Sequence, residues 1–149
     1  MTDFASLLQP DKGQSARTIE IVEAKDFAEW LAARPENVRA AAGAARFEAK
    51  PGEMLIAPGQ DAASWSVVAG APKHASVWDL AGIAARLPEG IYRLAQCNPG
   101  GAALGWLLAH HRFDRYRKET DPVPQRILLT GDPASIPETV RLAEATALV

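Results

Sequence analysis

Strand-like and helix-like segments alternate along the chain, and this order restricts the possible folds more than any other feature of the sequence. Runs rich in β-branched and apolar residues predict strands over 18–23, 64–70, 90–96 and 125–131. Apolar residues at helical spacing predict helices over 27–34, 36–42, 77–87, 102–119 and 135–149. Residues 45–59 contain two further strand-like runs around Pro51-Gly52, a pair that suits a type II turn and predicts a hairpin. We therefore expect a three-layer α/β/α domain with a mixed, mostly parallel sheet.

Several residues predict where the helices begin and end. Asp26 is expected to cap the first helix, and Pro35 to end it and open a second helix that Gly43 closes. In the longest helix, over 102–119, we expect Leu104, Leu107, Leu108 and His111 to lie near one face. Ser135 and Glu138 form a capping-box pattern before the last helix. No stop signal follows Leu148, so this helix either frays at a natural terminus or belongs to a chain that has been cut.

Composition narrows the class of protein. A chain of 149 residues with 48% hydrophobic residues suits one compact domain, here expected over 18–149, after a flexible lead or edge segment over 1–17. A net charge of −2 argues against binding to nucleic acid or to an anionic membrane through a global basic field. The single cysteine, Cys97, excludes an internal disulfide. Because the sequence also lacks a secretory signal and a membrane-length apolar run, we expect a cytoplasmic protein.

Loops that follow predicted strands are the candidate binding segments, because crevices in parallel sheets form beyond the carboxyl ends of strands. Three segments qualify: 70–74, 96–101 and 130–133. "NPGG" at 98–101 precedes a helix and can present backbone N–H groups to a phosphate. It lacks the full dinucleotide fingerprint, and the Walker pattern is absent, so an ordinary strand-to-helix turn is the favoured interpretation.

Few side chains suggest catalysis. His110 and His111 are neighbours on a predicted helix and point about 100° apart, so they cannot chelate one ion as an i, i+4 pair can. His74 is a lone loop histidine, and Cys97 is read as a small residue at a strand end rather than a nucleophile. The acidic residues are scattered. We therefore assign no catalytic, cofactor-binding or metal-binding residue in this chain.

One dense charged and aromatic stretch, "RFDRYRKE", occupies 112–119. Its cations suit the end of a helix, where they complement the helix dipole, and its rings can pack beneath their stems. The same residues also suit contacts to phosphates or to a protein partner. We favour the helix-end interpretation.

Taken together, "ALGWLLAHHRFDRYRKE" (103–119), the strand that follows, "ETVRLAEATALV" (138–149) and "ARFEAKPGEMLIAPG" (45–59) resemble the amino-terminal domain of the leucyl (cytosol) aminopeptidase family. The resemblance covers the chain from about residue 18. In the family, the long helix ends in a stretch like "RFDRYR", and the last helix runs on into the linker before the catalytic domain. The resemblance thus implies that the chain stops inside this connecting helix and that the catalytic domain is missing.

The same resemblance implies a function for the parent protein. Family members are metalloproteases that remove N-terminal amino acids from peptides, with two divalent ions, Zn or Mn, that activate water in the carboxy-terminal domain. No NTDAEGRL-type signature occurs here, so no family metal ligand or catalytic residue is carried onto this chain, which alone is not expected to be an enzyme. The amino-terminal domain resembles a macro domain. It is expected to serve assembly of a homohexamer and access to the active site, with its own catalytic domain and sister subunits as partners.

Two alternatives remain open at this stage. A macro-like fold suggests an ADP-ribose or nucleotide-binding module, with "NPGG" in the crevice. A DNA-contacting domain would use the cations of 112–119, although the acidic isoelectric point, near 5.9, argues against it.

Overall fold

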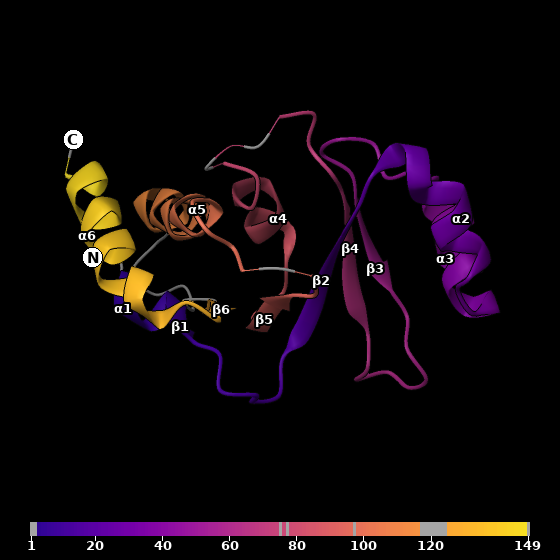
Figure 1. Ribbon diagram of the computed structural model, residues 1–149, viewed down its shortest axis with the longest axis horizontal. Helices are drawn as coiled ribbons and strands as arrows, with labels where there is room; N and C mark the ends of the chain where they lie inside the picture. Colours follow the sequence, from indigo (N-terminus) through magenta and orange to yellow (C-terminus); the bar gives the residue numbers. More distant parts are fainter. Residues whose placement is uncertain (1–2, 75, 77, 97, 117–124, 149) are drawn as a thin grey trace. The chain divides into compact units, whose positions relative to one another are not determined.

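The computed structural model describes residues 3–74, 76, 78–96, 98–116 and 125–148, with side chains as far as residue 111 in the fourth range (Figure 1). The strands are β1 (Leu8–Pro10), β2 (Arg17–Val22), β3 (Met54–Ala57), β4 (Ser66–Gly70), β5 (Gly90–Leu94) and β6 (Arg126–Thr130). The helices are α1 (Phe4–Leu7), α2 (Phe27–Ala32), α3 (Glu36–Ala45), α4 (Ala81–Arg86), α5 (Ala102–Tyr116) and α6 (Ile136–Ala147), with the 3-10 turns η1 (Ala24–Asp26) and η2 (Pro133–Ser135). The strands form a mostly parallel six-stranded sheet, which confirms the predicted α/β class.

The chain divides into two compact units. The first unit comprises residues 1–16, 76–93 and 97–149, and the second comprises 17–75 and 94–96. The first therefore contains β1, α4, α5, β6 and α6, and the second contains β2, α2, α3, β3 and β4.

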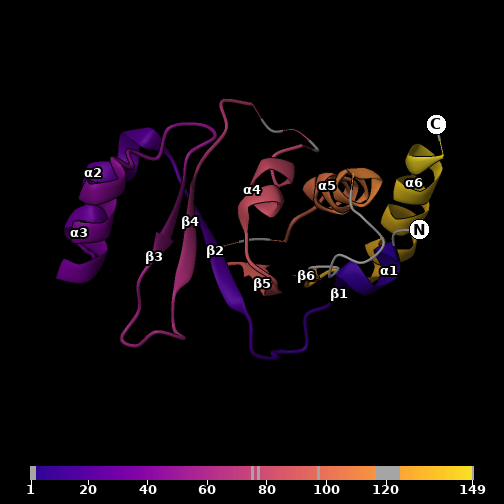
Figure 2. The ribbon, with the colours of Figure 1, turned by 180° about the vertical axis from the view of Figure 1, so that it is seen from behind.

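In the first unit, β6 lies between β1 and β5, and both pairs are parallel. Leu8 pairs with Leu128, and Phe4 and Leu8 are both buried. In both ribbon views α1 lies beside α6 (Figures 1 and 2). Residues 4–10 thus form a short helix and an edge strand of the sheet, and the expected division into residues 1–17 and a domain over 18–149 stays a prediction.

Helix α5 supplies much of the core of the first unit. Trp106 and Leu107 are fully buried, and the Trp106 indole N–H donates to the Arg126 carbonyl at 2.8 Å. Of the four residues expected near one face of this helix, Leu107 and Leu108 are buried, whereas Leu104 and His111 are half-buried. His110 is buried as well, and α5 packs against both α4 and α6 while Trp106 reaches β6.

In the second unit, β4 lies between β2 and β3, parallel to β2 and antiparallel to β3. The predicted hairpin around Pro51-Gly52 is wrong, because residues 45–50, immediately before this turn, form no strand. Glu53 explains the difference: its carboxylate accepts the backbone N–H groups of Glu48 at 3.0 Å and Lys50 at 2.9 Å. These two bonds lower the pKa of Glu53 and hold the segment as a loop. Strand β3 pairs with β4 instead.

Three predicted helix ends also differ from the structure. Asp26 and Ser135 occupy the residue before α2 and α6, yet neither side chain caps its helix. The 3-10 turns η1 and η2 precede these helices, and the Ser135 hydroxyl donates back to the Asp132 carbonyl at 2.8 Å. Helix α3 does begin after Pro35, but it continues past Gly43 and ends where Arg46 takes a left-handed conformation with φ 55°. Among the described residues, no helix is long and apolar enough to cross a membrane.

Candidate functional site

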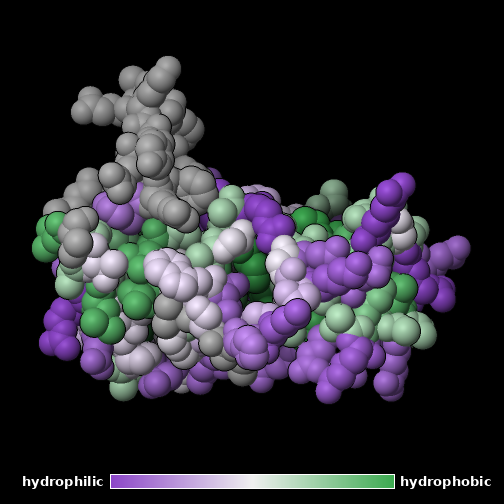
Figure 3. All heavy atoms as spheres, turned by 90° about the horizontal axis from the view of Figure 1, so that it is seen from above, coloured by the Kyte–Doolittle hydropathy of each residue, from purple (hydrophilic) through white to green (hydrophobic). Residues whose placement is uncertain are grey.

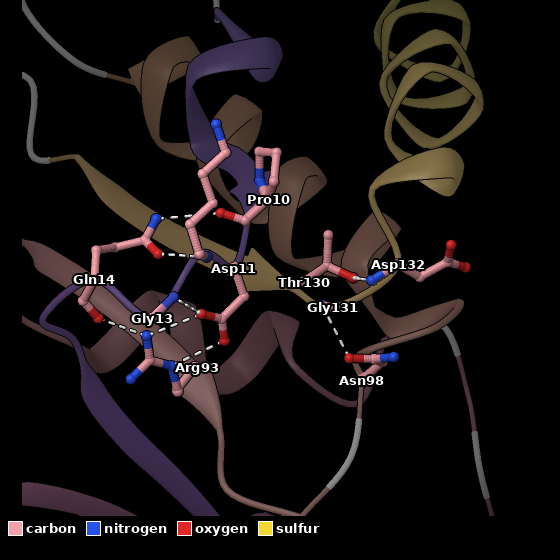
Figure 4. A network of polar contacts seen from close by, with 10 residues as sticks. Pro10, Asp11, Gly13, Gln14, Arg93, Asn98, Thr130, Gly131 and Asp132 are labelled. Atoms are coloured by element: carbon pink, nitrogen blue, oxygen red, sulfur yellow. Dashed lines mark hydrogen bonds and ion pairs between the residues drawn. The ribbon is translucent and has the colours of Figure 1, made fainter.

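The carboxyl ends of β1, β5 and β6 meet at one edge of the first unit, and polar side chains gather there (Figure 4). Arg93, on β5, donates through Nε to Asp11 Oδ2 and through a terminal nitrogen to Asp11 Oδ1, both at 3.0 Å. The same nitrogen donates to the Gln14 carbonyl. Each side chain of the Arg93–Asp11 pair is about a quarter exposed, at 25% and 26%. This two-point contact ties the turn after β1 to β5 across 82 residues of sequence.

The turn after β1 is closed by further hydrogen bonds. The Asp11 carboxylate accepts the Gly13 N–H at 3.0 Å, and the Asp11 N–H donates to the Thr130 carbonyl at 2.8 Å. The Gly13 bond first, and the Arg93 guanidinium second, hold the pKa of Asp11 below its ordinary value. Because Asp11 stays ionised, the positive charge of Arg93 is already paired.

Two of the three predicted binding segments come together at this edge. The Asn98 side-chain oxygen, from "NPGG", accepts the Gly131 N–H at 2.9 Å, and the Asp132 N–H donates to the Thr130 hydroxyl at 3.1 Å. The N–H groups of Gly131 and Asp132 are therefore bonded to the chain's own oxygens and are not available to a phosphate. The group of Asp11, Arg93, Asn98, Thr130 and Gly131, which we call the strand-end brace, thus holds loops together. It does not support a nucleotide site.

The other predicted segment and the start of "QCNPGG" lie in the second unit. Residues 70–74 belong there, and His74 is exposed. Gln96 also belongs there: its side-chain amide donates to the Ile21 carbonyl at 2.9 Å and accepts the Ile21 N–H at 3.3 Å. Gln96 therefore extends the pairing with β2 rather than lining an open crevice.

The two adjacent histidines face different surroundings. His110 is buried, with Nδ1 2.8 Å from the Trp106 carbonyl oxygen, whereas the half-buried His111 ring lies 6.3 Å from that of Phe4. Cys97 and residues 117–119 lie outside the described residues, as do the side chains of 112–116. Within the described part of the chain, no group of three or more His, Cys, Asp or Glu residues is placed to hold a metal ion.

Sequence reasoning missed a hollow in the first unit. An open pocket of about 320 Å³ is lined by Trp78, Leu108, His111, Thr146 and Ala147. Trp78 is 57% exposed, which is unusual for so large an apolar side chain. The available signal was a tryptophan in "SVWDL" at the start of a predicted helix, outside its apolar stripe. The described lining is apolar except for His111 and Thr146, a composition suited to binding an apolar group rather than to chemistry.

Comparison with known proteins places the chain. Residues 17–129 match the family model described as M17 aminopeptidase, N-terminal domain. Among solved structures, the chain is similar to a cytosol aminopeptidase from Coxiella burnetii, with a TM-score of 0.73 and 19% sequence identity. The similarity covers 93% of this chain but only 31% of that protein. No curated protein matches the chain.

Proposed function

The chain belongs to the M17 aminopeptidase family as an N-terminal domain, and from this premise we propose that it is the non-catalytic part of a longer metal-dependent leucyl aminopeptidase. The observation that carries the proposal is the family match over residues 17–129.

The divalent metals of the parent protein, Zn or Mn, belong in this proposal to the catalytic domain. The described residues of this chain do not fit such a site, because they bring no cluster of metal ligands together. The role of the domain is then to bind its own catalytic domain and sister subunits, in a homohexamer, and to limit access of peptides to the active site. We place the parent in the cytoplasm.

Hydrolysis of L-leucine p-nitroanilide tests the proposal. The complete natural polypeptide that contains these residues should release p-nitroaniline when Zn²⁺ or Mn²⁺ is added, and a chelator should abolish the activity. The 149-residue chain alone should show none under the same conditions. A complete polypeptide that is inactive with either metal on a panel of aminoacyl substrates would refute the proposed parent activity.

A further inference from the structure

Trp78 lines the apolar pocket of the first unit, in a segment held by backbone hydrogen bonds. The Trp78 N–H donates to the Ser76 hydroxyl at 3.1 Å, and the Trp78 carbonyl accepts the Ala81 N–H at 3.0 Å. The Ser76 N–H in turn donates to an Asp79 carboxylate oxygen at 2.9 Å. The Trp78 side chain is 57% exposed beside these bonds. Large exposed aromatic side chains of this kind are typical anchors of protein interfaces.

Other exposed apolar side chains lie on the helix that closes the pocket. Leu142 on α6 is 47% exposed, and Leu148, which follows the helix, is 81% exposed. Figure 3 shows hydrophobic residues gathered at the left end of the view, the end at which Figure 1 has α5 and α6. Surfaces of this kind mark contacts with another polypeptide. We call Trp78, Leu142, Leu148 and the pocket the α6-end surface.

The position of this surface indicates its occupant. Thr146 and Ala147 line the pocket and belong to the last turn of α6, so a polypeptide that continues beyond residue 149 leaves from its rim. The chain matches an N-terminal domain family and spans 31% of the aminopeptidase to which it is similar, which leaves most of such a protein to follow. A tethered segment has an effective concentration in the millimolar range, so a small apolar surface suffices to hold it. A stable complex with a separate copy of the chain typically buries about 800 Å² of surface on each partner.

We propose that the α6-end surface is the docking site for apolar side chains of the catalytic part of the same polypeptide, with Trp78 as the anchor. This inference rests on the proposed function. It adds the particular contact through which the N-terminal domain holds the remainder of the chain.

Tryptophan footprinting tests the docking. The 149-residue chain and the complete natural polypeptide are oxidised with N-bromosuccinimide, and each tryptophan is quantified by mass spectrometry. Trp78 should react about tenfold more slowly in the complete polypeptide, which requires the docked state to hold about 90% of the molecules. Trp106, fully buried, should react slowly in both, and Trp65 of the second unit equally in both. Equal rates for Trp78 in the two proteins would overturn the docking.

Two variants of the complete polypeptide give an independent test. Trp78→Asp should speed limited proteolysis in the segment after residue 149, because the surface no longer retains it. Trp78→Phe keeps an apolar aromatic side chain and should leave the rate near that of the parent. If both variants are cleaved at the parental rate, the surface does not hold the following segment.

The failure of this inference can be separated from failure of the proposed function. A complete polypeptide that is an active aminopeptidase but leaves Trp78 fully reactive refutes the docking alone. Protection of Trp78 in the 149-residue chain that grows with protein concentration would assign the surface to a second copy and overturn it. A natural polypeptide that ends at Val149 overturns the docking together with the parent activity.

Discussion

Truncation of Trp106 should destabilise the first unit strongly. The side chain is fully buried, lies 6.0 Å from the rings of both Tyr92 and His110, and donates its indole N–H to the Arg126 carbonyl. Replacing a buried tryptophan by alanine costs about 3–5 kcal/mol through lost burial and the cavity left behind. The variant also leaves the Arg126 carbonyl without its donor, and a buried unpaired carbonyl costs about 1–3 kcal/mol. The total cost should therefore lie in the upper part of the range. We expect Trp106→Ala to lower the free energy of unfolding by about 4 kcal/mol.

Urea unfolding followed by far-ultraviolet circular dichroism measures this loss without relying on the deleted fluorophore. At about 2–4 °C per kcal/mol for a chain of this size, the melting temperature should fall by about 8–16 °C. Trp78→Ala is the matched control, because the same atoms are removed from a side chain that is 57% exposed, and it should cost about 1 kcal/mol or less. Trp106→Phe should fall between the two, at about 1–2 kcal/mol, since it loses mainly the hydrogen bond. Equal losses for Trp106→Ala and Trp78→Ala would refute the assignment of Trp106 to the core.

The strand-end brace makes two further predictions, each measured by unfolding of the 149-residue chain. Gly131→Ala should destabilise by about 1 kcal/mol, because a Cβ there would lie 2.6 Å from the Asn98 side-chain oxygen and break its bond to the Gly131 N–H. Gly82→Ala, with no atom within 4 Å of the new Cβ in α4, should instead be neutral or stabilising by up to about 1 kcal/mol; equal effects of the two would refute the close approach. Asp11→Asn should lower the melting temperature at pH 7. The folded-state pKa of Asp11 is depressed, so its contribution to stability is present above the ordinary aspartate pKa, about 3.9. This contribution is lost as the pH falls through the folded-state pKa. A difference in melting temperature between the variant and the parent chain that persists in full well below that pKa would contradict this.

Much of the fold could be predicted from local sequence patterns. Strands β4, β5 and β6 lie within the predicted runs and β2 begins one residue before its run, because β-branched and apolar residues there are bounded by glycine or by polar segments. The family resemblance was also recognised correctly, and the family model confirms it over residues 17–129. Both predictions depend on features that a short stretch of sequence carries by itself.

The errors share a different physical cause. The hairpin around Pro51-Gly52 failed because a single carboxylate, Glu53, takes the two N–H groups that a strand would offer to a partner. The apolar stripe of α5 did not indicate that His110 is buried, because a helical stripe shows which residues are apolar, but not how many neighbouring elements surround the helix. In each case a competing contact outweighed the local pattern, and that contact cannot be read from the period of apolar residues.

The candidate site depends both on local sequence patterns and on contacts between residues far apart in the sequence. The rule that parallel strands end at one edge correctly brought "NPGG" and the segment after β6 together. Whether that edge is open to a ligand depends on two contacts between distant parts of the sequence. Asn98 and Gly131 are 33 residues apart, and Asp11 and Arg93 are 82 residues apart. These contacts occupy the Gly131 and Asp132 N–H groups and hold the loops of this edge together. In our proposal the domain contacts the rest of a longer polypeptide through the α6-end surface, where Trp78 is exposed beside the apolar pocket.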